Sequence, residues 1–143
     1  MEEKKTITLI SISFSYDNIR LTETNRAFLQ ALGYLPLGMN RHDLESIIDD
    51  AYDQIEILKE LGLCEETENS RIWVLAPIRE YLIRKTTLNN TFLEKIQNYY
   101  IELALSKGED VGKQEDGGSS IILRDEWNNI IKVIDVLRIF NFV

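Results

Sequence analysis

Few residues of this chain have the types and spacing that catalysis or metal binding requires. The 143 residues contain one histidine, His42, and one cysteine, Cys64. No second ligand lies at metal-binding spacing from His42, and Cys64 has no histidine near it in sequence. We expect a surface histidine at a helix start and a buried, unreactive cysteine. We find no paired-carboxylate or Ser-His-Asp arrangement around this single histidine, so the sequence predicts neither an enzyme nor a metal site.

The Gly112-Lys113 pair lacks the pattern of a phosphate-binding loop. Gly108 precedes it too closely, Gln114 stands where Ser or Thr is required, and no strand comes before it. We therefore expect no nucleotide or other cofactor. The stretch 107–120 has four glycines and no hydrophobic stripe, which predicts a mobile loop.

Composition restricts the partners that the chain can have. Hydrophobic residues make up 44% of the sequence and charged residues 28%, which is typical of a folded chain. The formal net charge of −8 disfavours binding to nucleic acid or to a membrane surface, since both are polyanions. No apolar run approaches the ~20 residues of a membrane-spanning helix. The single cysteine and the opening MEEKKT, which is no signal peptide, favour a soluble, cytoplasmic protein.

Helical periodicity is clearest in the first half of the chain. Residues 22–35 predict a helix with Thr24 as its cap. Asn40 is expected to cap the next helical stretch, which bends at residues 49–50 and stops at Gly62. Before these helices, residues 7–14 alternate as a strand would, although a buried helix is also compatible with them.

A hairpin and a further helix follow. Leu63 to Glu65 and Ile72 to Leu75 predict two short strands, with the polar run Glu66 to Ser70 as their turn. Pro77 suits the first turn of the next helix, where a missing N–H costs nothing. The order helix, hairpin, helix is that of the back half of a winged-helix domain.

Two longer helices are expected at the C-terminal end. In the first, apolar residues share one face: Phe92, Ile96, Tyr99, Tyr100 and Leu103. The second runs from about Ser120 to Phe140, and its apolar face is wide: Leu123, Trp127, Ile130, Ile131, Ile134 and Leu137, with Val133, Val136 and Phe140 beside it. A helix apolar over most of its circumference is buried on more than one side, so we expect either self-association or another protein segment to cover it.

Several stretches together resemble the winged-helix region of STAND-type NTPases, the NB-ARC and NACHT class, in a form similar to fungal members. The first stretch is Phe28 to Leu44, FLQALGYLPLGMNRHDL. The second is Leu58 to Leu82, where LKELGLCEE precedes the hairpin and RIWVLAPIREYL runs from its second strand into a helix. The third joins Tyr99 to Leu105, YYIELAL, with Leu123 to Ile130, LRDEWNNI.

This resemblance implies a mostly α fold in three parts. Residues 1–19 are a lead-in, residues 20–85 a winged-helix domain with a small β-hairpin, and residues 91–140 the first two helices of a repeat-like, TPR-like superhelix. It also implies a non-catalytic regulatory or scaffold segment of a signalling ATPase, whose nucleotide-binding module and helical repeats are its protein partners. The family often carries a Met-His-Asp motif that senses the bound diphosphate, but Val74, Leu75 and Ala76 stand there.

The alternative function is a DNA-binding winged-helix regulator, and charge argues against it. From Asp43 to Glu60, seven acidic residues face the single Lys59, so the presumed recognition helix would repel a duplex. From Arg71 to Lys95 the balance is basic, with five cations against two carboxylates. We expect this basic edge to contact an acidic protein domain. The candidate contact residues, none of them catalytic or cofactor-binding, are Arg79, Arg84, Lys85, Trp127 and Ile131; for Arg79 a structural ion pair or helix cap is an equal alternative.

Overall fold

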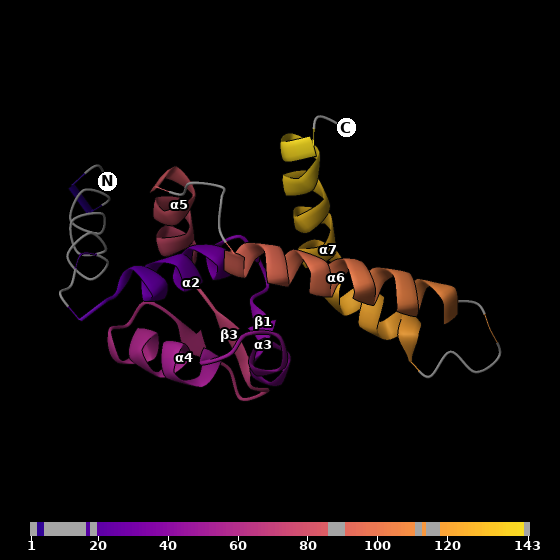
Figure 1. The fold of residues 1–143 in the computed structure, drawn as a ribbon, viewed down its shortest axis with the longest axis horizontal. Coiled ribbons are helices and arrows are strands. Elements are labelled where there is room, and N and C mark those ends of the chain that lie inside the picture. Colours follow the sequence, from indigo (N-terminus) through magenta and orange to yellow (C-terminus); the bar gives the residue numbers. More distant parts are fainter. Residues whose placement is uncertain are drawn as a thin grey trace.

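The computed structural model describes residues 3–4, 17, 20–85, 91–110, 113 and 118–141. These residues are mostly helical, with a small antiparallel sheet of three strands. In chain order the elements are α2 (Glu23–Gly33), β1 (Met39–Asn40), α3 (Arg41–Ile47), α4 (Ala51–Glu60), β2 (Glu65–Glu66), β3 (Arg71–Trp73), α5 (Ala76–Lys85), α6 (Thr91–Asp110) and α7 (Ser119–Asn141). Figure 1 shows α2 to α5 and the strands gathered at one end, with α6 and α7 extending away from them. The strand or helix expected over residues 7–14 lies outside the described residues.

The N-cap of helix α2 lies two residues before the predicted one. Thr22, not Thr24, is the N-cap: its Oγ1 accepts a hydrogen bond from the Asn25 N–H at 3.1 Å. The Asn25 Oδ1 in turn accepts from the Thr22 N–H at 2.9 Å. The prediction of Thr24 was wrong because a reciprocal capping box needs a polar side chain three residues after the cap. Thr22 has Asn25 at that spacing, whereas Thr24 has Ala27.

The expected bend between two short helices is confirmed. Asn40 caps α3, since its Oδ1 accepts from the His42 N–H at 2.9 Å. Helix α3 ends at Ile47, and Ile48 has an extended backbone. Asp50 then takes a left-handed conformation with φ of 60° before α4 starts. Because the carboxamides and carboxylates of Asn and Asp tolerate this region, an aspartate suits the position.

The sheet contains the predicted hairpin and one strand that was not predicted. Its order is β1-β3-β2, with both pairings antiparallel. Ile72 is opposite Met39 on one side and Glu66 on the other. The hairpin strands lie at Glu65–Glu66 and Arg71–Trp73, slightly offset from the predicted ranges. Strand β1 has only two residues, too few to produce a visible alternation in sequence.

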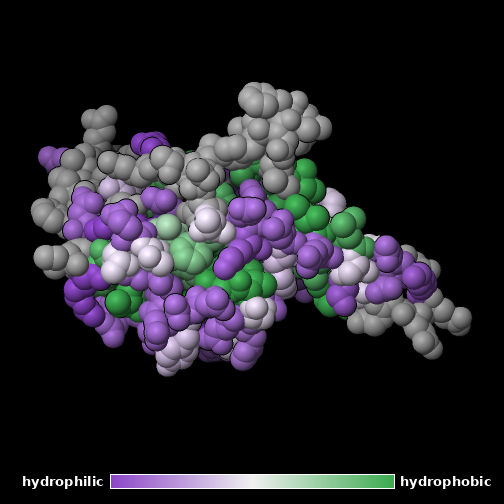
Figure 2. Space-filling model, viewed as in Figure 1, coloured by the Kyte–Doolittle hydropathy of each residue, from purple (hydrophilic) through white to green (hydrophobic). Residues whose placement is uncertain are grey.

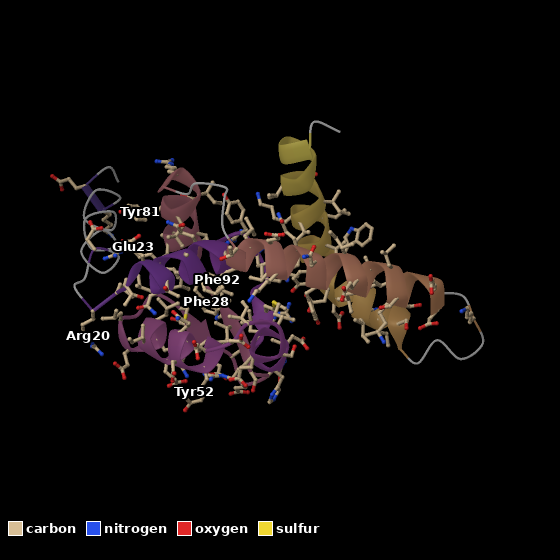
Figure 3. All side chains as sticks on the ribbon, in the orientation of Figure 1. Arg20, Glu23, Phe28, Tyr52, Tyr81 and Phe92 are labelled. Atoms are coloured by element: carbon tan, nitrogen blue, oxygen red, sulfur yellow. The ribbon has the colours of Figure 1, made fainter. Side chains whose placement is uncertain are left out.

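One cluster of buried hydrophobic residues includes members from both the 20–85 and the 91–136 regions. Phe28 of α2 and Phe92 of α6 meet edge to face, with ring centroids 5.6 Å apart. Figure 3 shows the two labelled side chains close together where α6 crosses α2. Leu82 of α5 is fully buried and closes the cluster on the side of α2. The predicted helix after Pro77 is therefore part of this core.

The loop predicted over 107–120 is too long at both ends. Helix α6 continues to Asp110, and α7 already begins at Ser119. Lys107 lies in the last turn of α6, where a positive charge complements the helix dipole. A Cβ at Gly108 would meet open space, so no close contact requires a glycine at this position. None of the described helices combines the length and the apolar character needed to cross a membrane.

Candidate interdomain site

Arg71, on the central strand β3, joins the sheet to the C-terminal helix. Its guanidinium forms a bidentate ion pair with Glu126 of α7. The distance from Nη1 to Oε1 is 2.7 Å, and that from Nη2 to Oε2 is 2.8 Å. The same side chain donates to the backbone carbonyls of Leu37 at 2.7 Å and Gly38 at 3.2 Å. A planar guanidinium is well suited to holding a carboxylate and two carbonyls at once.

Asn129 of α7 makes the second connection, and its side chain is fully buried. Its Nδ2 donates to the Gly38 carbonyl at 2.8 Å, and its Oδ1 accepts from the Leu37 N–H at 3.1 Å. The side-chain amide of Asn129 therefore bonds to one carbonyl and one N–H of the loop before β1, as the backbone of a neighbouring strand would. The Nδ2 also lies 3.0 Å from the Tyr100 hydroxyl and 3.1 Å from Glu126 Oε2.

Tyr100 of α6 completes the polar network, which we define as Gly38, Arg71, Tyr100, Glu126 and Asn129. Its hydroxyl donates to Glu126 Oε2 at 3.0 Å. Burial raises the pKa of Tyr100, and the adjacent carboxylate raises it further. Burial also acts to raise the pKa of Glu126, but the hydrogen bond and charge of Arg71 outweigh it and lower that pKa. Glu126 is thus held as an anion among donors.

Gly38 is the one member of the network that contributes only backbone. Its φ is +65°, and a Cβ at this position would lie 2.1 Å from the Ile72 carbonyl oxygen. No other residue type fits without displacing β3. The glycine lets the loop pass directly against the sheet. In this position the Gly38 carbonyl accepts hydrogen bonds from Arg71 and Asn129.

A second polar cluster, on the other side of the sheet, surrounds Arg41. Its Nη2 lies 2.7 Å from Glu66 Oε1 and 2.7 Å from Glu56 Oε1, and Lys59 Nζ lies 2.9 Å from Glu66. The Arg41 guanidinium also lies over the Tyr52 ring, with its Cζ 5.4 Å from the ring centroid. Hydrogen bonds from Arg41 and then Lys59 lower the pKa of Glu66 to about 2. Part of the acidic surface predicted for α3 and α4 is therefore neutralised inside the chain.

The predicted basic contact residues lie on α5. Arg79 is partly buried, and its Nε donates to the Gly33 carbonyl at 3.2 Å, so it caps the end of α2. This agrees with the structural alternative that the sequence left open. Burial lowers the pKa of Arg79, which its neighbour Glu80 opposes. Arg84 is exposed, and the side chain of Lys85 lies outside the described residues.

The predicted apolar contact residues, Trp127 and Ile131, lie on α7. Trp127 is 55% exposed and Ile131 39% exposed. The buried face of α7 is instead formed by Asn129, Ile130, Val133 and Val136. A polar pair three residues apart, Glu126 and Asn129, precedes this buried stripe. That interruption was the one signal of the polar network in the sequence, and the predicted apolar face passed over it.

The structure places the two residues considered for chemistry, His42 and Cys64, in different surroundings. His42 is exposed, as expected, and Cys64 is buried. Burial raises the pKa of Cys64 to about 12, so the thiol is protonated at neutral pH. Among the described residues, no group of three His, Cys, Asp or Glu side chains is placed to hold a metal ion.

Comparison of the chain with protein-family models, with curated proteins and with solved structures gives no significant match.

Proposed function

We propose that this chain is a non-catalytic regulatory or scaffold segment of a cytoplasmic STAND-type signalling ATPase. In this proposal residues 20–85 are a winged helix and α6 and α7 begin a TPR-like superhelix. The observed order of helix, strand, two helices and hairpin supports the first assignment. The antiparallel packing of α6 against α7 supports the second.

The polar network carries the proposal. Arg71 and Asn129 attach α7 to β3 and to the loop before β1 through side-chain bonds to both a carboxylate and backbone groups. Such buried, directional bonds fix one orientation of the helices relative to the sheet, which apolar contacts alone do not. A segment of this kind transmits a displacement of one attached domain to another. It requires no chemistry of its own.

The DNA-binding alternative is not favoured by the charges on α4. Asp49, Asp50, Asp53 and Glu60 are exposed at or near this helix, where a winged-helix regulator would contact phosphates. A titration of the purified chain against random duplex tests this point. We expect no change in the gel mobility of the duplex at low salt. Salt-sensitive binding in the micromolar range would overturn the proposal in favour of a DNA-binding regulator.

The decisive observation is the complete reading frame. We expect a P-loop nucleotide-binding module on the N-terminal side and helical repeats on the C-terminal side. A frame that encodes neither would contradict the proposal. In a protein that contains both, Asn129→Ala is expected to change the rate of ATP hydrolysis by the whole protein, whereas the exposed neighbour Asn128→Ala leaves it unchanged. Equal rates for both variants would argue against a regulatory role of the network.

A further inference from the structure

Helix α7 leaves a stripe of large apolar side chains uncovered in the described structure. Trp127, Ile131 and Ile134 are 55%, 39% and 43% exposed, and their spacing of four and three residues places them on one side of the helix. Leu105 of α6, 67% exposed, borders the same region. Figure 2 shows hydrophobic surface continuing along the part of the molecule formed by α6 and α7. Exposed patches of this kind mark association surfaces.

An apolar hollow lies on this side, between α6 and α7. It has a volume of about 210 Å³, and its lining is formed by Tyr100, Ile101, Ala104, Leu105, Ile130, Val133 and Ile134. Ile134 belongs both to the hollow and to the exposed stripe. Trp127, two helical turns before it, lies roughly 10 Å away along the axis. One face of one helix pair therefore carries both a projecting aromatic side chain and a cavity of a size that receives one.

Two opposite charges border the stripe. Arg124 and Asp135 are exposed and eleven residues apart, so an α-helix places them on nearly the same edge, one on each side of the apolar segment. Within the chain, Arg124 Nε lies 3.5 Å from Asp125 Oδ1, an exposed contact that contributes little energy. Along this edge of α7 the positive Arg124 comes first, followed by the exposed polar Asn128 and the apolar Ile131, and then by the negative Asp135.

We propose that this face binds a second copy of the chain, with the two α7 helices antiparallel about a twofold axis that passes between them at the level of Asn129 and Ile130. This arrangement places Arg124 of each copy opposite Asp135 of the other. It also places each Trp127 against the turn that carries Ile131 and Ile134, at the mouth of the other copy's hollow. A twofold interface requires a surface complementary to itself, and this face meets that requirement in both shape and charge.

A parallel arrangement lacks this complementarity. It would place Arg124 opposite Arg124 and Asp135 opposite Asp135, which repel each other. It would also stack Trp127 on its own copy and leave both hollows empty. The antiparallel pairing does not depend on the proposed function, because it uses only the described faces of α6 and α7.

Charge reversal tests the pairing directly. The mass of the full chain is measured by sedimentation equilibrium over a range of concentrations reaching about 100 µM. We expect a monomer–dimer equilibrium for the unmodified chain. Arg124→Glu or Asp135→Arg alone is expected to raise the dimer dissociation constant about tenfold, since each interface contains the pair twice. The double variant Arg124→Glu/Asp135→Arg is expected to return it to within about threefold of the original value.

Two variants that each remove an exposed aromatic side chain distinguish association through this face from non-specific association. Trp127→Ser is expected to abolish the dimer. Tyr52→Ser, which removes an exposed aromatic side chain of α4 (Figure 3), is expected to leave it intact. Circular dichroism confirms that each variant is folded. A monomer at every concentration, association that survives Trp127→Ser, or single reversals that the double variant does not rescue would each overturn the proposal, the first pointing to a different protein or a small apolar molecule on this face.

Discussion

Arg71 and Glu126 are 55 residues apart in sequence and form a bidentate ion pair between the sheet and α7, at 2.7 and 2.8 Å. Both side chains are largely withdrawn from water, with 26% and 15% of their surface exposed. Each compensates the cost of burying the other, so the pair is more important for the orientation of the helices than for total stability.

Removing one partner of this pair is expected to be costly. Glu126→Gln leaves the Arg71 guanidinium partly buried without its counter-charge, and we expect a loss of about 2–3 kcal/mol in the free energy of unfolding. Urea denaturation followed by circular dichroism measures this loss. Glu60→Gln, which breaks the exposed pair with Arg20, is the control and is expected to change stability by less than about 0.5 kcal/mol. Equal effects of the two variants would contradict the role of the network.

Asn129 and its neighbour Asn128 provide a matched comparison within one helix turn. Asn129→Ala leaves the Leu37 N–H without its partner and removes a bond to the Gly38 carbonyl, so we expect about 2–3 kcal/mol of destabilisation. Asn128→Ala changes an exposed side chain and is expected to have little effect or to stabilise α7 slightly. Thermal unfolding of both variants distinguishes them, and similar melting temperatures would refute the expectation.

Glycine substitutions test the close passage of the loop against β3. Gly38→Ala places a Cβ 2.1 Å from the Ile72 carbonyl oxygen, which forces the loop away from the sheet. We expect a loss of more than about 2 kcal/mol. Gly62→Ala has a similar φ of +69° but meets open space, and is expected to lose only about 1 kcal/mol. Denaturant midpoints rank the two, and a Gly38→Ala variant as stable as Gly62→Ala would show that the loop yields easily.

Stability is expected to fall in acid, partly through Glu66. Its pKa in the folded chain is about 2, against an ordinary value of 4.5, so its ion pairs stabilise the fold fully above about pH 4.5. This contribution is lost as pH decreases from 4.5 toward 2, because the unfolded chain takes up the proton first. Urea midpoints measured across this range should decrease less steeply for Glu66→Gln. A slope unchanged by the substitution would contradict the shifted pKa.

Cys64 is expected to report unfolding. Because burial raises its pKa to about 12, the folded protein should react with iodoacetamide at pH 8 at least about 100-fold more slowly than the urea-unfolded chain. Mass spectrometry of the alkylated protein measures both rates. Rapid labelling of the folded chain would show that the hairpin opens readily or that the thiol is exposed.

Local signals in the sequence were sufficient for most helices. The bend at residues 49–50, the cap at Asn40 and the helix after Pro77 were predicted because capping groups, proline and apolar spacing act within a few residues. The two-residue strand β1 was missed because its pairing with β3 is long-range. Thr24 was preferred to Thr22 because two threonines lie close together and only one has Asn25 at the right spacing.

The candidate site divides in the same way. The sequence by itself determined that α7 is apolar over much of its surface, that the chain is acidic, and that it lacks a histidine or glycine pattern for catalysis or phosphate binding. Tertiary structure alone decided that Asn129 and Glu126 face the sheet while Trp127 and Ile131 remain exposed. The physical reason is that Arg71 and the Gly38 carbonyl, distant in sequence, supply the partners that make it favourable to bury polar side chains on one face and leave apolar ones on the other.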